Sequence, residues 1–213
     1  MKKYILFDND GVLVNTEPWY HRAGERALAD VGFTLDKEQY VQGMAQALGT
    51  WAQARAAGVD EQTISRQRAV RDEYYQEYLR TESIEIEGVV ETLAELSKHV
   101  RMAIVTTSKR TDFEIIHADR AITRFMDFIL VREDYTLAKP HPEPYLTGLE
   151  KFGARKEETL VVEDSSRGLR SAVAAGIDCA VVHDEFTATQ DFSAARYRIS
   201  TLAELKDIVL GVA

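Results

Sequence analysis

Acidic, hydroxyl and amine side chains stand at four places along the 213-residue chain. In order they are Asp8 and Asp10 with Gly11, then Thr106, then Lys139, and finally Glu163 with Asp164. The acidic and hydroxyl members follow short apolar runs, "YILF", "MAIV" and "TLVV". Because ligands collect at the carboxyl ends of the strands in a parallel α/β sheet, we expect these groups to meet there. Carboxylates, a hydroxyl and an amine at one sheet edge indicate magnesium-dependent phosphoryl transfer.

The first motif pairs two carboxylates. Asp8 and Asp10 are two residues apart, so an extended backbone directs both side chains to one side, and Gly11 then allows a sharp turn. One carboxylate can attack phosphorus while the other handles the proton of the leaving group. Asp-x-Asp-Gly also occurs by chance. An EF-hand loop is a further alternative, but it needs glycine at its sixth position, where this chain has Leu13.

The second acidic pair, Glu163 and Asp164, closes another apolar run. Mg²⁺ takes hard oxygen ligands and keeps several waters, so one or two carboxylates and a substrate oxygen suffice. Asp8 and Asp164 are the candidates, with Glu163 acting directly or through water. The alternative is an exposed acidic pair at a strand end, and the conjunction with Asp8 and Asp10 favours the metal.

The remaining two signals suit a phosphate group. The hydroxyl of Thr106 and the neighbouring amides can hold phosphoryl oxygens, while Ser108 and Lys109 can reach a second anion; such residues also commonly cap a following helix. Lys139 in "LAKPHPEPY" can offset the charge of Asp8 and of phosphate as a point charge. The prolines around it stiffen the backbone, whereas most lysines are simply solvated.

Composition limits the classes of protein. The chain is 45% hydrophobic, enough for a buried core, and its net charge of −9 argues against a nucleic-acid partner. The single cysteine, Cys179, lies in an apolar run and is predicted to be structural, and one cysteine excludes an internal disulfide. The stretch "MKKYILFDND" is too short for a signal peptide, and no apolar run is long enough for a bilayer span. We therefore predict a cytoplasmic protein without a membrane partner.

The periodicity of apolar residues changes twice along the chain. A strand over 3–7 is followed by helical patterns over 18–31, 36–47, 51–57 and 60–80, and then strands alternate with helices. The later strands are predicted over 101–107, 125–131, 158–164 and 177–182, and a helix over 201–210. This order predicts an α/β protein, a Rossmann-like parallel sheet core with an inserted α-helical cap. The core comprises 1–15 and 83–213, and the cap 16–82.

Taken together, the motifs "FDNDGVL", "IVTTS", "AKPHPEPY" and "VVEDSSRG" closely resemble those of the haloacid dehalogenase-like superfamily of hydrolases. The resemblance covers nearly the whole chain. The "DNDGVLVNTEP" and "KPHPEP" forms resemble the branch with a helical cap after the first motif. That branch holds many sugar-phosphate phosphatases and the β-phosphoglucomutases.

The resemblance implies a role for each matching residue. Asp8 would be the nucleophile that forms an aspartyl-phosphate, and Asp10 the acid and base, its backbone carbonyl binding magnesium. Thr106 and Lys139 would stabilise charge on the phosphoryl oxygens. The expected Mg²⁺ ligands are Asp8, Asp10, Glu163 and Asp164. The expected substrate-binding residues are Thr106, Thr107, Ser108, Lys109 and Lys139 in the core and Tyr20 and Gln46 in the cap. Cap opening is expected to gate access, with hinges near Asn15 and over 82–87.

Some residues of the chain argue for or against particular activities of similar proteins. Dehalogenases lack the second acid, which is Asp10 here, and phosphonate hydrolases use a cap lysine, whereas no lysine lies between Lys3 and Lys37. The β-phosphoglucomutases carry a histidine where this chain has Tyr20, and an arginine where it reads Gly43-Met44-Ala45-Gln46.

Without that arginine a substrate with two phosphates is held less well. We therefore predict a magnesium-dependent phosphatase of a small phosphorylated metabolite, a sugar phosphate, in a monomer or small homo-oligomer. The alternatives are a β-phosphoglucomutase-type isomerase and a phosphate-responsive binding module without activity. Cap residues that can read the leaving group include Tyr20, His21, Gln46, Trp51 and Arg71, for each of which ordinary packing is the alternative.

Overall fold

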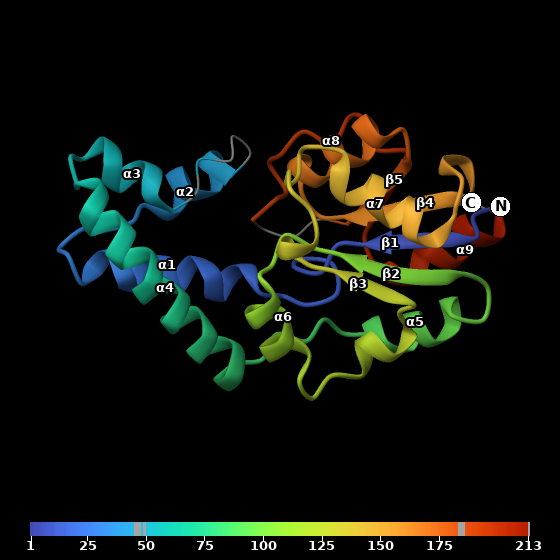
Figure 1. The fold of residues 1–213 in the computed structure, drawn as a ribbon, viewed down its shortest axis with the longest axis horizontal. Coiled ribbons are helices and arrows are strands. Elements are labelled where there is room, and N and C mark those ends of the chain that lie inside the picture. The colour runs from blue at the N-terminus through green and yellow to red at the C-terminus, as the bar shows by residue number, and fades with distance from the viewer. Residues whose placement is uncertain (45–47, 49, 183–185, 213) are drawn as a thin grey trace. The chain divides into compact units, whose positions relative to one another are not determined.

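A computed structural model describes residues 1–44, 48, 50–182 and 186–212 of the chain (Figure 1). The chain divides into two compact units. The core unit comprises Met1–Asn15 and Glu85–Ala213, and the helical unit comprises Thr16–Ile84. Gln46, one of the predicted substrate-binding residues, lies outside the described residues.

The core unit is built on one parallel sheet. In the described part of the chain it has six strands in the order β3-β2-β1-β4-β5-β6, every neighbouring pair parallel. The strands are β1 (Tyr4–Phe7), β2 (Arg101–Val105), β3 (Phe128–Leu130), β4 (Thr159–Glu163), β5 (Asp178–Val182) and β6 (Tyr197–Ile199). Phe7, the last residue of β1, is in register with Ile104 of β2 and Val162 of β4. The predicted Rossmann-like sheet is confirmed, and three of its strands end side by side.

Helices cover both faces of this sheet. The core helices are α5 (Val89–Leu96), α6 (Arg110–His117), α7 (Glu143–Phe152), α8 (Ser166–Ala175) and α9 (Leu205–Leu210). Figure 1 shows α7 and α8 on one face and α5 and α6 on the other. The face under α7 and α8 buries alternate residues of the central strands, such as Leu6, Ala103 and Val161. This two-residue period is the one expected of strands covered by helices.

Some boundaries differ from those expected from the sequence. Of the predicted strand over 125–131 only β3 pairs in the sheet, and a 3₁₀ turn (Ala121–Phe125) precedes it. The predicted helix over 201–210 begins as a 3₁₀ turn (Leu202–Glu204), held by a capping box between Thr201 and Glu204, before α9. Strand β6 was not predicted, since its three residues include the exposed Arg198. Cys179 lies buried in β5, as expected.

The helical unit contains α1 (Glu17–Ala29), α2 (Lys37–Met44), α3 (Trp51–Ala56) and α4 (Glu61–Thr81). Proline at the start of α1 is tolerated because its missing amide has no helical partner, and Asp60 caps α4 by accepting from the amide of Thr63 at 2.9 Å. Helices α1 and α4 pack on each other through an edge-to-face contact between Tyr20 and Tyr75. Tyr75 of α4 therefore helps to pack these two helices together.

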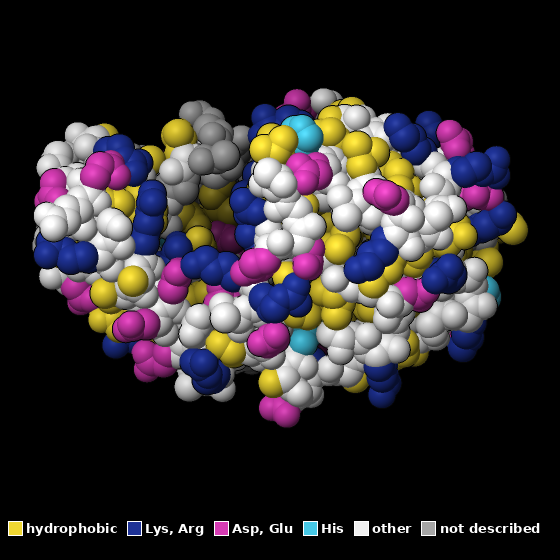
Figure 2. Space-filling view, in the orientation of Figure 1, with side chains coloured by type: hydrophobic (Ala, Val, Ile, Leu, Met, Phe, Trp, Pro, Cys, Tyr) yellow, Lys and Arg dark blue, Asp and Glu magenta, His cyan; other side chains and the backbone are white. Residues whose placement is uncertain are grey.

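Acidic and basic side chains are interspersed over the visible face of the molecule (Figure 2). Within the described residues, no helix has both the length and the apolar character that a bilayer span requires.

Candidate active site

The ends of β1, β2 and β4 carry the predicted chemistry. Asp8 directly follows β1, Thr106 directly follows β2, and Glu163 is the last residue of β4, with Asp164 next. Lys139 comes from the loop before α7, and its Nζ lies 3.0 Å from Asp8 Oδ1 and 2.8 Å from Glu163 Oε1. Residues far apart in sequence thus meet at the carboxyl edge of the sheet, where α/β proteins bind ligands.

The ammonium group of Lys139 is buried and held by oxygen atoms. Besides the two carboxylates, Nζ donates to the carbonyl oxygen of Val105 at 2.8 Å. Burial opposes its charge, but Asp8 and Glu163 outweigh burial and raise the pKa of Lys139 above its ordinary value. The side chain is therefore a fixed positive charge at this edge.

Asp8 lies in an unusual environment for a carboxylate. Burial, and then the negative charge of Glu163, raise its pKa from 3.8 to about 7, although Lys139 acts in the opposite direction. A carboxylate shifted in this way is a candidate for chemistry or for cation binding.

Asp10 is held by the turn after β2 rather than by Lys139. Its Oδ2 accepts hydrogen bonds from Ser108 Oγ and, at 3.3 Å, from Thr106 Oγ1. Thr106 Oγ1 in turn accepts from the amide of Ser108 at 3.0 Å. The two hydroxyls expected to contact phosphate are thus hydrogen-bonded to Asp10 in this structure.

Gly11 permits the turn that follows Asp10. Its φ of +77° is in the left-handed region, and a Cβ built on it would lie 2.1 Å from Asp164 Oδ2. Any other residue would collide with that carboxylate. The turn after β1 is therefore closed directly against the end of β4.

Three buried carboxylates can form a cation site. Asp8, Glu163 and Asp164 each offer one oxygen, and these oxygens lie within 4.8 Å of one another. The donors are hard oxygens, and Lys139 is the ammonium in contact with two of these three carboxylates. The donor set and its excess negative charge fit a divalent cation such as Mg²⁺.

The other predicted residues are placed as follows. Thr107 accepts from Arg167 Nη2 at 3.3 Å, whereas Lys109 is exposed at the start of α6. Tyr20 belongs to the helical unit, where the guanidinium of Arg71 lies 4.4 Å from its ring centroid.

Several residues of this region were not predicted from the sequence. Tyr145 donates its hydroxyl to Glu163 Oε1 at 2.5 Å, and Tyr135 donates to the carbonyl of Thr106 at 2.6 Å. His117 Nε2 lies 2.7 Å from Oδ1 of Asn9, the residue between the two aspartates. The polar Asn9 inside an apolar-flanked motif was an available signal, since a buried amide needs a partner. The tyrosines read as ordinary core residues.

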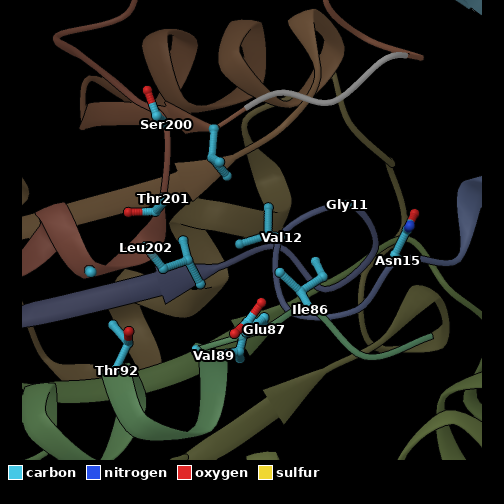
Figure 3. A pocket seen from close by; sticks show the side chains of 13 residues that line it. Gly11, Val12, Asn15, Ile86, Glu87, Val89, Thr92, Ser200, Thr201 and Leu202 are labelled. Carbon is cyan, nitrogen blue, oxygen red and sulfur yellow. The ribbon is translucent and has the colours of Figure 1, made fainter. Parts of the chain in front are cut away.

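A cavity of about 450 Å³ adjoins the turn after β1 (Figure 3). Val12, Ile86 and Leu202 project into it, and Asn15 and Glu87 lie on the segments that lead to and from the helical unit. Its described lining is mainly apolar and contains none of the clustered carboxylates. The cavity therefore borders both connecting segments but is separate from the phosphate-binding candidates.

The fold and the site define a class of enzyme: a parallel α/β protein whose central strands present carboxylates, hydroxyls and one buried lysine at their carboxyl ends. The sequence profile of the haloacid dehalogenase-like hydrolases matches residues 5–182. The chain belongs to that family.

Known relatives are similar over most of their length. The chain is 31% identical to a phosphoglycolate phosphatase of Photorhabdus laumondii, covering 82% of this chain and 77% of the relative. It is 30% identical to a phosphorylated carbohydrates phosphatase of Thermotoga maritima, with 82% of each covered. A crystal structure of CbbY from Rhodobacter sphaeroides with phosphate is 25% identical, covers 96% of each chain and superposes with a TM-score of 0.81.

Proposed function

We propose that this chain is a magnesium-dependent phosphatase that hydrolyses a small phosphorylated metabolite through an aspartyl-phosphate. The carrying observation is the contact between Asp8 and the fixed ammonium of Lys139, at the sheet edge that also holds Asp10 and Asp164. Membership of a hydrolase family and similarity to phosphatases support a phosphoric monoester hydrolase.

In this proposal Asp8 attacks phosphorus and the P–O bond to the leaving group breaks. Its neighbour Lys139, which three oxygens hold beside Asp8, would offset negative charge on the phosphoryl oxygens. Asp8 and Asp164, with the backbone carbonyl of Asp10, would hold Mg²⁺. When bound, this ion would supply positive charge beside the carboxylate and the phosphoryl oxygens.

Asp10 is proposed to give a proton to the leaving oxygen and then to take one from the water that hydrolyses the intermediate. Thr106 and Ser108 already orient its carboxyl group through Oδ2. The same hydroxyls lie in the turn that we expect to bind phosphate, so a phosphoryl group would compete with Asp10 for them.

Glu163 remains a predicted participant in the metal site, but its oxygens are already engaged. Oε1 accepts from Lys139 and Tyr145, and Oε2 from the amide of Asp164 and the hydroxyl of Ser165. This arrangement favours a role for Glu163 in holding Lys139 over direct coordination of Mg²⁺.

For the substrate we propose a sugar phosphate or a similarly small phosphate monoester. The Thermotoga relative is named for phosphorylated carbohydrates, and a mutant of CbbY has been crystallised with xylulose 1,5-bisphosphate. The helical unit would act as the cap that selects the leaving group, with Tyr20 among its contacts. Mg²⁺, a cytoplasmic location and a monomer or small homo-oligomer complete the proposal.

Hydrolysis of p-nitrophenyl phosphate and of a panel of sugar phosphates, with Mg²⁺ or with EDTA, tests the proposal. We expect turnover that requires both the metal and Asp8. Absence of such turnover on every substrate would contradict it.

The mutase alternative is separated by its products. A phosphoglucomutase converts β-glucose 1-phosphate to the 6-phosphate and is stimulated by the bisphosphate, whereas a phosphatase releases inorganic phosphate. We expect phosphate release without isomerised sugar.

A further inference from the structure

Tyr145 lies in the first turns of α7, a few residues after Lys139. Its side chain is fully buried, and its hydroxyl donates to Glu163 Oε1 at 2.5 Å. Burial, and then the charge of Glu163, raise the pKa of Tyr145 well above its ordinary value, so the phenol keeps its proton and remains a donor. None of the proposed chemistry uses this group directly.

The carboxylate that Tyr145 contacts, that of Glu163, is held in one position. Glu163 is fully buried, and each of its oxygens accepts two hydrogen bonds. A Cβ on Gly168 would lie 1.8 Å from the Glu163 carboxyl carbon, so only glycine leaves room for the group. With two donors at each oxygen, the usual hydrogen-bonding capacity of a carboxylate is filled.

Oε1 of Glu163 is shared between Tyr145 and Lys139. Lys139 Nζ lies 2.8 Å from this oxygen and 3.0 Å from Asp8 Oδ1, and 4.7 Å from the centroid of the Tyr145 ring. A lysine ammonium has three N–H bonds, and three oxygens are in reach of it here. The phenol thus contacts both the carboxylate and the ammonium.

We propose that Tyr145 is a positioning residue for Lys139, an inference that rests on the phosphatase function proposed above. The hydrogen bond from its hydroxyl offsets some of the negative charge on Glu163. The ammonium of Lys139 therefore stays in contact with both Glu163 and Asp8. Without the hydroxyl, the buried Oε1 of Glu163 loses one of its two donors and keeps only Lys139. Glu163 then draws the ammonium closer, away from Asp8 and the phosphoryl group.

The central variant is Tyr145→Phe, which removes the hydroxyl and keeps the ring. We expect kcat for p-nitrophenyl phosphate to fall about tenfold, while KM and the half-saturating Mg²⁺ concentration stay within about twofold. The matched control is Tyr4→Phe, the same change at the first residue of β1, remote from the sheet edge that carries the site. That variant should keep the kcat of the wild type.

Two measurements separate positioning from a merely structural role. In a double-mutant cycle with Glu163→Gln, the losses in kcat should be strongly non-additive, since Tyr145 acts through that carboxylate. A crystal structure of metal-free Tyr145→Phe should show Lys139 Nζ moved from Asp8 toward Glu163. Wild-type kcat in Tyr145→Phe, additive losses, or an unmoved Lys139 would each overturn the inference.

Glu163→Gln alone keeps the inference testable if Tyr145→Phe fails to fold. We expect a lower kcat at an unchanged half-saturating Mg²⁺ concentration. An activity restored by raising Mg²⁺ would instead assign Glu163 to the metal and overturn the proposal. Failure of the phosphatase function itself is recognised separately, because wild-type enzyme would then show no turnover dependent on metal and Asp8.

Discussion

Each of the two units buries a cation, and the two are held differently. In the core unit Lys139 contacts oxygens that belong to the ends of three different strands, at Asp8, Val105 and Glu163. In the helical unit Arg71 pairs at 2.8 Å with Asp72, its neighbour on the same helix, and lies over the ring of Tyr20. The lysine is thus held by oxygens at the ends of three strands, and the arginine by one carboxylate of its own helix and by the aromatic rings of Tyr20 and Trp51.

We expect this difference to match two roles, a catalytic one for the core unit and a substrate-selecting one for the helical unit. A charge held by the ends of three strands has a defined position relative to the sheet, which suits a group that must meet every substrate in the same way. A charge held by one neighbour and by aromatic faces can be exchanged at little cost to the rest of the unit. We therefore expect substitutions in the core unit to change kcat, and those in the helical unit to change substrate preference.

The largest effect is expected from Asp8→Asn. Removal of the proposed nucleophile should lower kcat at least about 10⁴-fold, as for the nucleophiles of other hydrolases. Circular dichroism should show an intact fold, since the amide has the same shape. A variant that kept wild-type biological function without turnover would instead favour a binding module.

Removing each buried cation makes the comparison direct. Lys139→Met should lower kcat by about 10²–10³-fold and the free energy of unfolding by about 3–5 kcal/mol, because it leaves buried carboxylates uncompensated. Arg71→Met should leave kcat for p-nitrophenyl phosphate within about twofold and lower the free energy of unfolding by about 1–3 kcal/mol, because it removes one partner of a largely buried ion pair. Steady-state kinetics and urea unfolding of the two variants measure both effects. Equal losses of kcat would break the proposed division between the units.

A buried histidine in each unit allows a comparison by pH. Burial lowers the pKa of His117 from 6.5 to about 4, and burial also lowers the pKa of His21. Between pH 4 and pH 6.5, His117 is protonated in the unfolded chain but not in the native protein. Its contribution to stability is therefore complete above pH 6.5 and is lost as the pH falls toward 4, by at most about 3 kcal/mol.

Urea unfolding at pH 7 and pH 4.5 measures this loss. His117→Gln should flatten the dependence and also lower kcat, because His117 holds Asn9 between the two aspartates. His21→Gln is the matched control, since His21 packs on the ring of Tyr40 in the helical unit. It should leave kcat for p-nitrophenyl phosphate unchanged. An unaltered pH dependence in His117→Gln would contradict the assignment.

The smallest effect is expected from Tyr20→Phe in the helical unit. If Tyr20 contacts the leaving group, KM should rise by about three- to tenfold for one member of a sugar-phosphate panel, the value of one hydrogen bond. The kcat for p-nitrophenyl phosphate should not change. A uniform loss across the panel would assign Tyr20 to packing alone.

The sequence predicted best what depends on strand ends. Asp8, Thr106 and Glu163 each follow or end an apolar run, and parallel pairing brings such positions together without further information. The order of strands and helices likewise determined the class of fold, which is confirmed. The short β6 was missed because three residues are too few to establish a period.

What the sequence could not predict arises from packing. Tyr145 lies at the core-facing position of a helix, and nothing in its surroundings along the chain distinguishes it from other buried tyrosines. Its contact with Glu163 joins residues 18 positions apart. The hydrogen-bond partner of Thr106 and Ser108 was equally unpredictable from the sequence, because both hydroxyls contact Asp10, nearly a hundred residues away.

The hydroxyl of Ser165 connects the start of α8 with the buried carboxylate of Glu163. As the N-cap of α8, its hydroxyl accepts from the amide of Gly168 in the first turn of that helix and donates to Glu163 Oε2 at 3.1 Å. We therefore expect the first turn of α8 and the hydrogen bonds of the Glu163 carboxylate to form together. Amide hydrogen exchange at Gly168 becomes a reporter of active-site assembly, readable without substrate or turnover.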